Sequence, residues 1–222
     1  MASQHAISHY RMKIKKLGHC CLLIENEGVR VLTDPGAWND GTDTVTGLDA
    51  LVITHEHSDH LHLPSVKTVL ENNPGVRIIS NASVAALLSN EGISCEIVGH
   101  EAETEVKGMK LKGFGNEHEE IYGALGKVEN TGYLFAEKFY YPGDSFYKPN
   151  AVVEILAVPV CGPWMRIKEC IDFVKALTPK ISFPVHDGML KIYGPFHAVP
   201  EKLLLQENIG FTVLLPGEEK EF

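Results

Sequence analysis

The segment THEHSDH (residues 54–60) says most about the fold and chemistry of this chain, because it carries three histidines and an aspartate within six positions. Imidazole and carboxylate groups are costly to crowd together unless a positive ion lies among them. Side chains two positions apart on an extended segment point the same way, so His55 and His57 can bind one ion. Asp59 and His60, a turn later, can face a second ion. The segment therefore predicts a metal site, and a solvated histidine-rich loop is the weaker interpretation.

The residues just before this segment predict where it lies in the fold. ALVIT (residues 50–54) is an apolar run too short for a helix, which predicts a strand that runs into the histidines. The histidine segment is then a loop at the carboxyl end of a strand, where binding and catalytic residues gather.

Three more candidate ligands follow predicted strands. They are His118 in GFGNEHEE, Asp144 in YYPGDS and His186 in FPVHDG. Taken singly, each has an ordinary explanation: His118 as a surface histidine, Asp144 as a turn residue, and His186 as a histidine satisfied beside its neighbour. Because each ion needs more ligands than residues 54–60 supply, the three together favour a metal centre built from several loops.

The remaining sequence alternates between strands and helices. Helices are predicted over residues 65–73, 81–92, 166–177 and 199–210, with Asn81 as a cap of the second. Strands are predicted over residues 13–17, 20–25, 29–33, 50–54, 76–80, 95–98, 104–107, 109–114, 131–137, 138–143, 155–160, 181–185 and 211–215. Two strand-rich halves that each carry helices predict an α/β fold in which two sheets pack face to face with helices outside.

Length and charge limit the organisation and the partners. The 222 residues, 44% of them hydrophobic, fit one domain over residues 12–222, and residues 1–11 are expected to form a disordered extension. The net charge of −9 repels a phosphate backbone, so no nucleic-acid partner is expected. A small-molecule substrate is expected instead, and an assembly of identical copies is left open.

Cysteine usage and hydropathy bear on the cellular location. The five cysteines are odd in number and include no CxxC pair, which indicates reduced, mostly buried thiols and neither a disulfide framework nor a thiolate zinc site. No apolar run of about 18 residues is present, and the first residues lack the apolar stretch of a signal peptide. The sequence thus predicts a cytoplasmic protein without a membrane partner.

The order of these motifs resembles the metallo-β-lactamase superfamily. His-x-His-x-Asp-His, then a histidine, then an aspartate after a strand, then a histidine after a strand is the pattern of that superfamily, and it extends over nearly the whole chain. The resemblance implies an αββα four-layer sandwich, with two mainly antiparallel or mixed sheets, helices outside and a dinuclear site between the sheets. Within the superfamily the chain is most similar to the ascorbate-6-phosphate lactonase-like branch. The similar segments are LGHCCLLIE (17–25), VLTDPG (31–36), YYPGDS (140–145), VPVCGPWM (158–165) and LTPKISFPVHDG (177–188).

The resemblance also implies a role for each candidate ligand. One metal is held by His55, His57 and His118, the other by Asp59, His60 and His186, and Asp144 bridges the two. Asp59 is in addition expected to orient the nucleophilic water or to pass its proton to the leaving group.

Two departures from the branch concern the substrate. NEHEEIYG (116–123) lacks the small serine-rich sequence expected after the third histidine, and Asp187 stands where an aromatic residue is more usual. The second histidine of the pattern is present as His57, so the sequence differs from the flavodiiron variant, which has a glutamate there.

A pair of divalent ions predicts hydrolysis. Two ions about 4 Å apart lower the pKa of a bound water from 15.7 toward 7 and produce a metal-bound hydroxide. The nitrogen and oxygen ligands suit zinc first, with manganese or iron as alternatives. The leading function is hydrolysis of a small lactone, ester or amide. The alternatives are a phosphodiesterase acting on a nucleotide or short nucleic acid, and a non-catalytic metal-binding protein that keeps the fold.

Several other residues have two interpretations each. Asp34 is expected either to fix the tautomer of a ligand histidine or to cap a turn before Pro35. His19 either approaches the site or is a core histidine. Trp38, and Trp164 with the methionine after it, either line the substrate pocket or pack under loops. His197 is expected to cap the helix that follows it, or else to reach the pocket rim.

Overall fold

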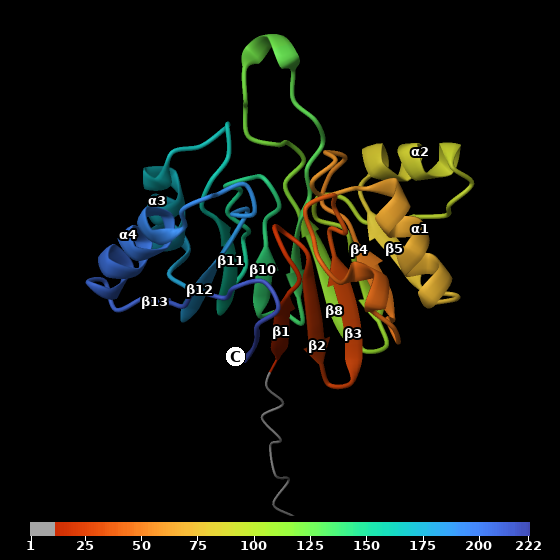
Figure 1. Cartoon of the computed structure of the whole chain (residues 1–222), viewed down its shortest axis with the longest axis horizontal. Coiled ribbons are helices and arrows are strands. Elements are labelled where there is room, and N and C mark those ends of the chain that lie inside the picture. The colour runs from red at the N-terminus through yellow and green to blue at the C-terminus, as the bar shows by residue number, and fades with distance from the viewer. Residues whose placement is uncertain (1–11) are drawn as a thin grey trace, which may run out of the picture.

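The computed structural model describes residues 12–222, and the extension expected over residues 1–11 lies outside the described residues. The described chain forms two seven-stranded sheets and four α-helices (Figure 1). The helices are α1 (Leu63–Asn72), α2 (Ala82–Asn90), α3 (Ile167–Leu177) and α4 (Gly194–Leu205), with short 3-10 helices η1 (Thr42–Thr44) and η2 (Gly123–Leu125).

The first sheet has the order β14-β1-β2-β3-β4-β5-β6. Its strands are β1 (Lys13–Lys16), β2 (Leu22–Asn26), β3 (Val29–Thr33), β4 (Ala50–Val52), β5 (Arg77–Ser80), β6 (Glu96–Ile97) and β14 (Glu219–Glu221). Neighbours from β14 to β3 pair antiparallel, and neighbours from β3 to β6 pair parallel.

The second sheet has the order β13-β12-β11-β10-β9-β8-β7. Its strands are β7 (Glu103–Val106), β8 (Met109–Phe114), β9 (Gly132–Phe135), β10 (Phe139–Tyr141), β11 (Ile155–Pro159), β12 (Ile181–Val185) and β13 (Gly210–Phe211). Neighbours from β7 to β10 pair antiparallel, and neighbours from β10 to β13 pair parallel. Both sheets are therefore mixed, as predicted.

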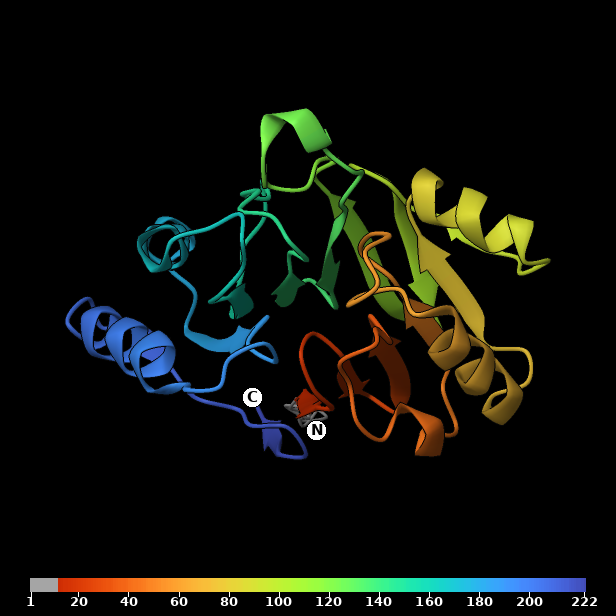
Figure 2. The same ribbon diagram turned by 45° about the horizontal axis from the view of Figure 1, so that its top comes forward.

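Three hydrophobic layers divide the described chain into four layers of secondary structure. The central one packs side chains of both sheets together, such as Ile24 and Val52 against Phe135 and Phe183. A second layer joins the first sheet to α1 and α2, and a third joins the second sheet to α3 and α4. Figure 2 shows the two helix pairs on opposite outer sides of the sheets. The predicted αββα sandwich is confirmed.

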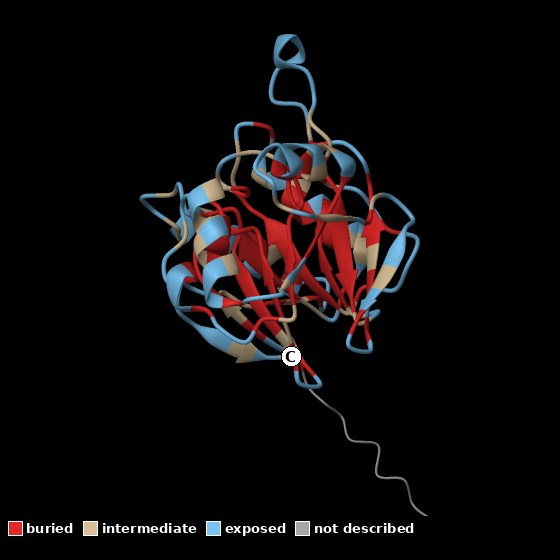
Figure 3. Ribbon diagram, turned by 90° about the vertical axis from the view of Figure 1, so that its right-hand side faces the viewer, coloured by how far each residue is buried: buried red, intermediate tan, exposed pale blue. Residues whose placement is uncertain are grey.

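Burial follows this layering. Figure 3 shows buried strands between helices whose outer faces are exposed. On α3, Ile171 and Val174 recur at helical spacing and are buried, and each such side chain stabilises the fold by roughly 1.5–3 kcal/mol. Asn81 caps α2 as predicted, because its side chain accepts the backbone N–H of Val84.

The structure differs from the sequence prediction at two places in the last quarter of the chain. The fourth helix was expected over residues 199–210, but α4 begins at Gly194, with Pro195 in its first turn. Pro200 lies inside this helix, although a proline more often marks a helix start. Strand β14 was not predicted, because its Glu-Lys-Glu sequence shows no apolar alternation.

The loops that carry the candidate ligands leave one edge of the sandwich. They follow β4, β8, β10 and β12, and the loop after β8 projects farthest from that edge, with η2 at its tip (Figure 1).

Candidate metal centre

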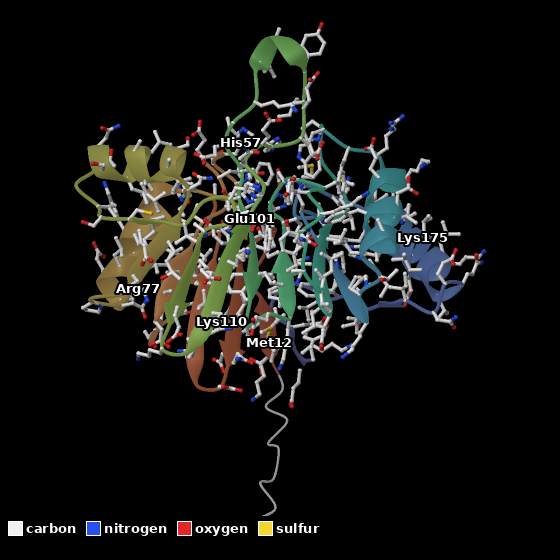
Figure 4. All side chains as sticks on the ribbon, turned by 180° about the vertical axis from the view of Figure 1, so that it is seen from behind. Met12, His57, Arg77, Glu101, Lys110 and Lys175 are labelled. Carbon is white, nitrogen blue, oxygen red and sulfur yellow. The ribbon has the colours of Figure 1, made fainter. Side chains whose placement is uncertain are left out.

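The structure brings all seven sequence-predicted ligands together. His55, His57, His118 and Asp144 place one ligand atom each within 4.8 Å of one another. His60 and His186 belong to a second such group, and Asp59 Oδ2 lies 3.6 Å from His186 Nε2. Figure 4 shows His57 at the base of the projecting loop.

Asp144 lies between the two groups. Its Oδ2 atom is 3.2 Å from Nε2 of His118 and 2.9 Å from Nε2 of His186. Its Oδ1 atom is 3.2 Å from Nε2 of His60. One carboxylate therefore faces histidines of both groups, and the indole N–H of Trp164 donates to its Oδ2 at 3.1 Å. The buried Trp164 thus contacts the carboxylate rather than only lining a pocket.

Contacts outside the site aim the Nε2 atoms of four histidines inward. Nδ1 of His118 and Nδ1 of His186 donate to backbone carbonyls, those of Glu119 and Cys161. Nδ1 of His55 lies 3.0 Å from the hydroxyl of Thr54. In the neutral form of each ring the outward nitrogen carries the hydrogen, so the inward nitrogen keeps the lone pair that a metal needs.

Asp34 orients the fourth of these histidines, His60. Its Oδ2 atom accepts from Nδ1 of His60 at 2.7 Å, from the hydroxyl of Thr54 at 2.7 Å and from that of Tyr141 at 2.5 Å. Its Oδ1 atom accepts the backbone N–H of Thr54 at 2.8 Å. The carboxylate orients a candidate ligand from outside, and it does so in a left-handed backbone conformation, with φ of 36°. Sequence reasoning missed Tyr141, which lies in a strand buried throughout.

Several inward-facing atoms lack a hydrogen-bond partner among the described residues. They include Nε2 of His60, Nε2 of His186 and Oδ1 of Asp144, all buried. Buried polar atoms are normally paired, because leaving one unpaired costs about 1–3 kcal/mol. Divalent cations accept these lone pairs, so the donor set fits metal binding.

The charge balance supports the same interpretation. Burial, together with the charge of His60, keeps the pKa of His55 well below its usual value, so this ring is neutral. Burial raises the pKa of Asp144, but the charges of His186 and His60 outweigh it and hold the pKa well below the usual range. Burial likewise opposes ionisation of Asp59, yet His19 and His60 lower its pKa to about 2. Burial lowers the pKa of His60 and of His186, but the charge of Asp144 outweighs it and raises both. Neutral imidazoles and ionised carboxylates are the forms that bind metal, so these two rings would release a proton when a metal binds.

His19 and Cys20 also lie in the second group. Each places one ligand atom within 4.8 Å of those of His60 and His186, and both are buried. Burial raises the pKa of the Cys20 thiol, but the charges of His19 and His60 lower it to about 6. The interpretation of all five cysteines as ordinary thiols therefore misses Cys20, because a single cysteine beside a histidine has no diagnostic spacing.

A second buried charged cluster begins one residue beyond His186. Nζ of Lys16 contacts both carboxylate oxygens of Asp187, at 2.7 and 2.8 Å, and donates to the carbonyl of Pro184 at 3.0 Å. Nε2 of His197 lies 3.0 Å from Asp187 Oδ2. We call Lys16, Asp187 and His197 the Lys16 cluster. The prediction that His197 caps the following helix is wrong, because Tyr193 occupies the cap position and His197 lies inside α4, buried against Asp187.

The loop after β3 packs tightly on the histidine segment. A Cβ atom at Gly36 would lie 1.7 Å from the carbonyl oxygen of Asp59, and the backbone N–H of Ala37 donates to the carbonyl of Ser58 at 2.9 Å. The next residue, Trp38, is 48% exposed, and its ring centroid is 4.9 Å from that of His19. Trp38 is thus a surface aromatic beside the site.

A family model described as a beta-lactamase superfamily domain matches residues 13–186. That span contains all seven candidate ligands and ends at His186. The chain belongs to the metallo-β-lactamase superfamily.

Individual relatives agree with membership in the metallo-β-lactamase superfamily. Protein Rv0786c of Mycobacterium tuberculosis is 32% identical over 184 residues, which cover 81% of this chain and 85% of that protein. A UPF0173 metal-dependent hydrolase of Methanocaldococcus jannaschii is 26% identical over 220 residues, covering 92% and 97% of the two chains. The structure of Igni18, a metallo hydrolase of Ignicoccus hospitalis, superposes with a TM-score of 0.75 at 19% identity, covering 96% of this chain and 98% of that one. This last likeness shows the shared fold.

No helix among the described residues is long and apolar enough to cross a membrane.

Proposed function

We propose that this member of the metallo-β-lactamase superfamily is a dinuclear metal-dependent hydrolase of a small lactone, ester or amide. The observation that carries the proposal is the position of Asp144, whose two oxygens face histidines of both ligand groups. The M. jannaschii relative is named a metal-dependent hydrolase and Igni18 a metallo hydrolase, which supports the reaction class.

Two groups of side chains would hold the proposed ions. His55, His57 and His118 would hold the first, Asp59, His60 and His186 would hold the second, and Asp144 faces both groups. Histidines together with carboxylates are ligands of catalytic zinc sites, whereas structural zinc sites contain cysteines. When bound, two divalent cations make a coordinated water acidic enough to attack near neutral pH and stabilise charge on the attacked oxygen.

The chain's own residues supply orientation and proton transfer. Asp34 holds the ring of His60, and Trp164 holds Asp144, so the two central side chains have fixed positions. Asp59 is ionised and 15% exposed, so its carboxylate can orient a water at the site, and with a pKa of about 2 it would release to a leaving group any proton that reaches it.

Zinc is the cation that the donor set favours. Imidazole nitrogens and carboxylates suit zinc, although they also bind manganese and iron. The net charge of −9 favours a small substrate over a polyanion.

Elemental analysis of the purified protein tests the proposal. After reconstitution with zinc, close to two ions should bind per chain, and the same value is expected for His62→Ala, a control near the site in sequence but outside the ligand set. A panel of lactones, thioesters, β-lactams and bis(p-nitrophenyl) phosphate then identifies the bond that is cleaved. Zinc content that stays at zero or one contradicts the dinuclear proposal, and turnover of the phosphodiester alone contradicts the proposed substrate class.

A further inference from the structure

His19 lies inside the candidate metal site, but its ring is held differently from those of the proposed ligands. Its side chain is fully buried, and its ring centroid lies 4.1 Å from that of His186. The proposed ligand set does not include it, although its position would allow it to be a further nitrogen ligand.

The outward nitrogen of His19 accepts a hydrogen bond, whereas those of four proposed ligands, His55, His60, His118 and His186, donate one. The backbone N–H of Gly188 donates to His19 Nδ1 at 2.9 Å, so this nitrogen uses its lone pair away from the site. A neutral imidazole has one N–H, which must then be on Nε2. With Nδ1 accepting from Gly188, Nε2 carries the hydrogen and has no lone pair for an ion.

The loop after β12 fixes this orientation. The backbone N–H of His186 donates to the carbonyl of His19 at 3.0 Å, next to the bond from Gly188. A Cβ atom at Gly188 would lie 2.9 Å from His19 Cβ and 3.1 Å from its Nδ1, so glycine allows the loop to approach the ring closely. A turned-over ring would lose the bond from Gly188.

Nε2 of His19 lies beside Asp59. It is 3.3 Å from Asp59 Oδ2, and it makes no hydrogen bond of good geometry to any described residue, so this carboxylate oxygen is within reach of a small adjustment of either side chain. The same Oδ2 atom lies 3.6 Å from His186 Nε2 and 3.9 Å from His60 Nε2. A carboxylate oxygen has two lone pairs, so it can accept a hydrogen bond and bind an ion together.

We propose that His19 is a positioning residue, not a metal ligand, and that its Nε2–H group holds Asp59 Oδ2 in place as a ligand of the second ion. This inference rests on the proposed function, because it takes Asp59 to be a ligand. Removing a hydrogen bond to a ligating group typically costs 10–100-fold in metal affinity or activity.

The first test determines which ring nitrogen of His19 carries a hydrogen. Nitrogen-15 NMR of the zinc-loaded full chain, with the His19 signals assigned from their loss in His19→Gln, should show a hydrogen bonded directly to Nε2. His100 is a matched internal control, because the backbone N–H of Gly115 donates to its Nδ1 at 3.1 Å and it lies outside both ligand groups. His60 should show the opposite pattern. A His19 Nε2 without hydrogen in the zinc-loaded protein overturns the proposal.

The second test measures zinc binding by calorimetry. At saturating zinc, His19→Ala should still hold two ions, but the weaker ion should bind about 10–100-fold less tightly than in the parental protein. His19→Gln places an amide N–H near the position of Nε2–H and should recover most of this loss. The proposal is wrong if His19→Ala holds only one ion, if its affinities equal the parental ones, or if His19→Gln recovers nothing.

A failure of the proposed function can be distinguished from a failure of the His19 proposal. If the proposed function is wrong, the parental protein binds fewer than two zinc ions or turns over no substrate of the panel. The ring measurement and the comparison between variants require no turnover.

Discussion

Two buried charged clusters share the segment that follows β12, and they differ in how their charge is balanced. His186 turns into the candidate metal site, where inward-facing nitrogens and a carboxylate oxygen have no hydrogen-bond partner among the described residues. Asp187 turns into the Lys16 cluster, where Nζ of Lys16 contacts both oxygens of the carboxylate and His197 lies against one of them. The positive φ of His186, 58°, separates the directions of the two side chains.

The comparison separates stability from function. The Lys16 cluster is complete within the protein, so it joins β1 to the loop after β12 whatever is bound. The candidate metal site is complete only with cations. Neighbouring residues of similar polarity can therefore have unlike roles, and the number of unpaired buried atoms distinguishes them.

The largest effect should come from Asp144→Ala. Because Asp144 faces both ligand groups, its loss should remove at least one ion and lower kcat/KM by several orders of magnitude. Asp34→Asn removes an orienting carboxylate instead and should cost about 10–100-fold. Zinc analysis and turnover of the best panel substrate measure both, with Asp172→Ala as an exposed control. If Asp144→Ala keeps two ions and a near-parental rate, the shared-ligand assignment is wrong.

The next effect concerns the Lys16 cluster and should appear in stability. Lys16→Met leaves the Asp187 carboxylate buried without its cation, which should lower the free energy of unfolding by about 3–5 kcal/mol. Lys13→Met changes an exposed lysine of the same strand and should stay within about 0.5 kcal/mol of the parental protein. Denaturant unfolding measures both. A Lys16→Met protein as stable as Lys13→Met would show that the cluster contributes nothing.

Metal removal should affect only one of the two clusters. Ions that bind the folded state alone stabilise it by mass action, by about 2.7 kcal/mol at a free concentration 100 times the Kd. A strong chelator should therefore lower the thermal midpoint of the parental protein and of Lys16→Met. Asp144→Ala, expected to hold fewer ions, should respond less than the parental protein. Superimposable melts of the parental protein with and without chelator, after verified metal loss, would contradict the role given to the ions.

The smallest effect is a pH dependence of the Lys16 cluster. Burial raises the pKa of Asp187, but the hydrogen bond with His197 and the charge of Lys16 outweigh it, so the pKa lies below the usual value. Such a carboxyl group stabilises the fold fully above its unfolded pKa of about 3.9. The contribution falls as the pH drops through the folded pKa, at about 1.4 kcal/mol for each unit of pKa difference.

Metal-free parental protein and Asp187→Asn provide the measurement. The difference between their free energies of unfolding should be constant from about pH 7 down to about pH 5 and should shrink below about pH 4. A difference that stays constant down to pH 3 would mean that the folded and unfolded pKa values of Asp187 are equal.

The sequence predicted the fold and the candidate ligands because both leave recognisable patterns in short stretches of sequence. THEHSDH places four candidate ligands within seven positions, and the others follow recognisable strand ends. The layers followed from short apolar runs and helical spacing, as in α3, whose buried residues recur every three or four positions. Each of these signals is contained in one short stretch of sequence.

The Lys16 cluster could not be predicted in this way. Alternation along β1 places Lys16 on the same face as the buried Ile14, but a lysine is usually exposed, and only its partner explains the burial. That partner, Asp187, is 171 positions away. Cys20 and Tyr141 were missed for the same reason, since their contacts with the site come from the packing of the two sheets.

The close approach of Gly36 to Asp59 has an evolutionary consequence. Gly36 does not have a positive φ, so its backbone would accept other residues, and only the space taken by the next loop forbids them. The smallest single step, to alanine, would push a Cβ into a peptide carbonyl and displace the segment that carries the candidate ligands. A single substitution of Gly36 is therefore not tolerated by this structure. A lineage that loses the glycine must at the same time acquire changes that shift both loops.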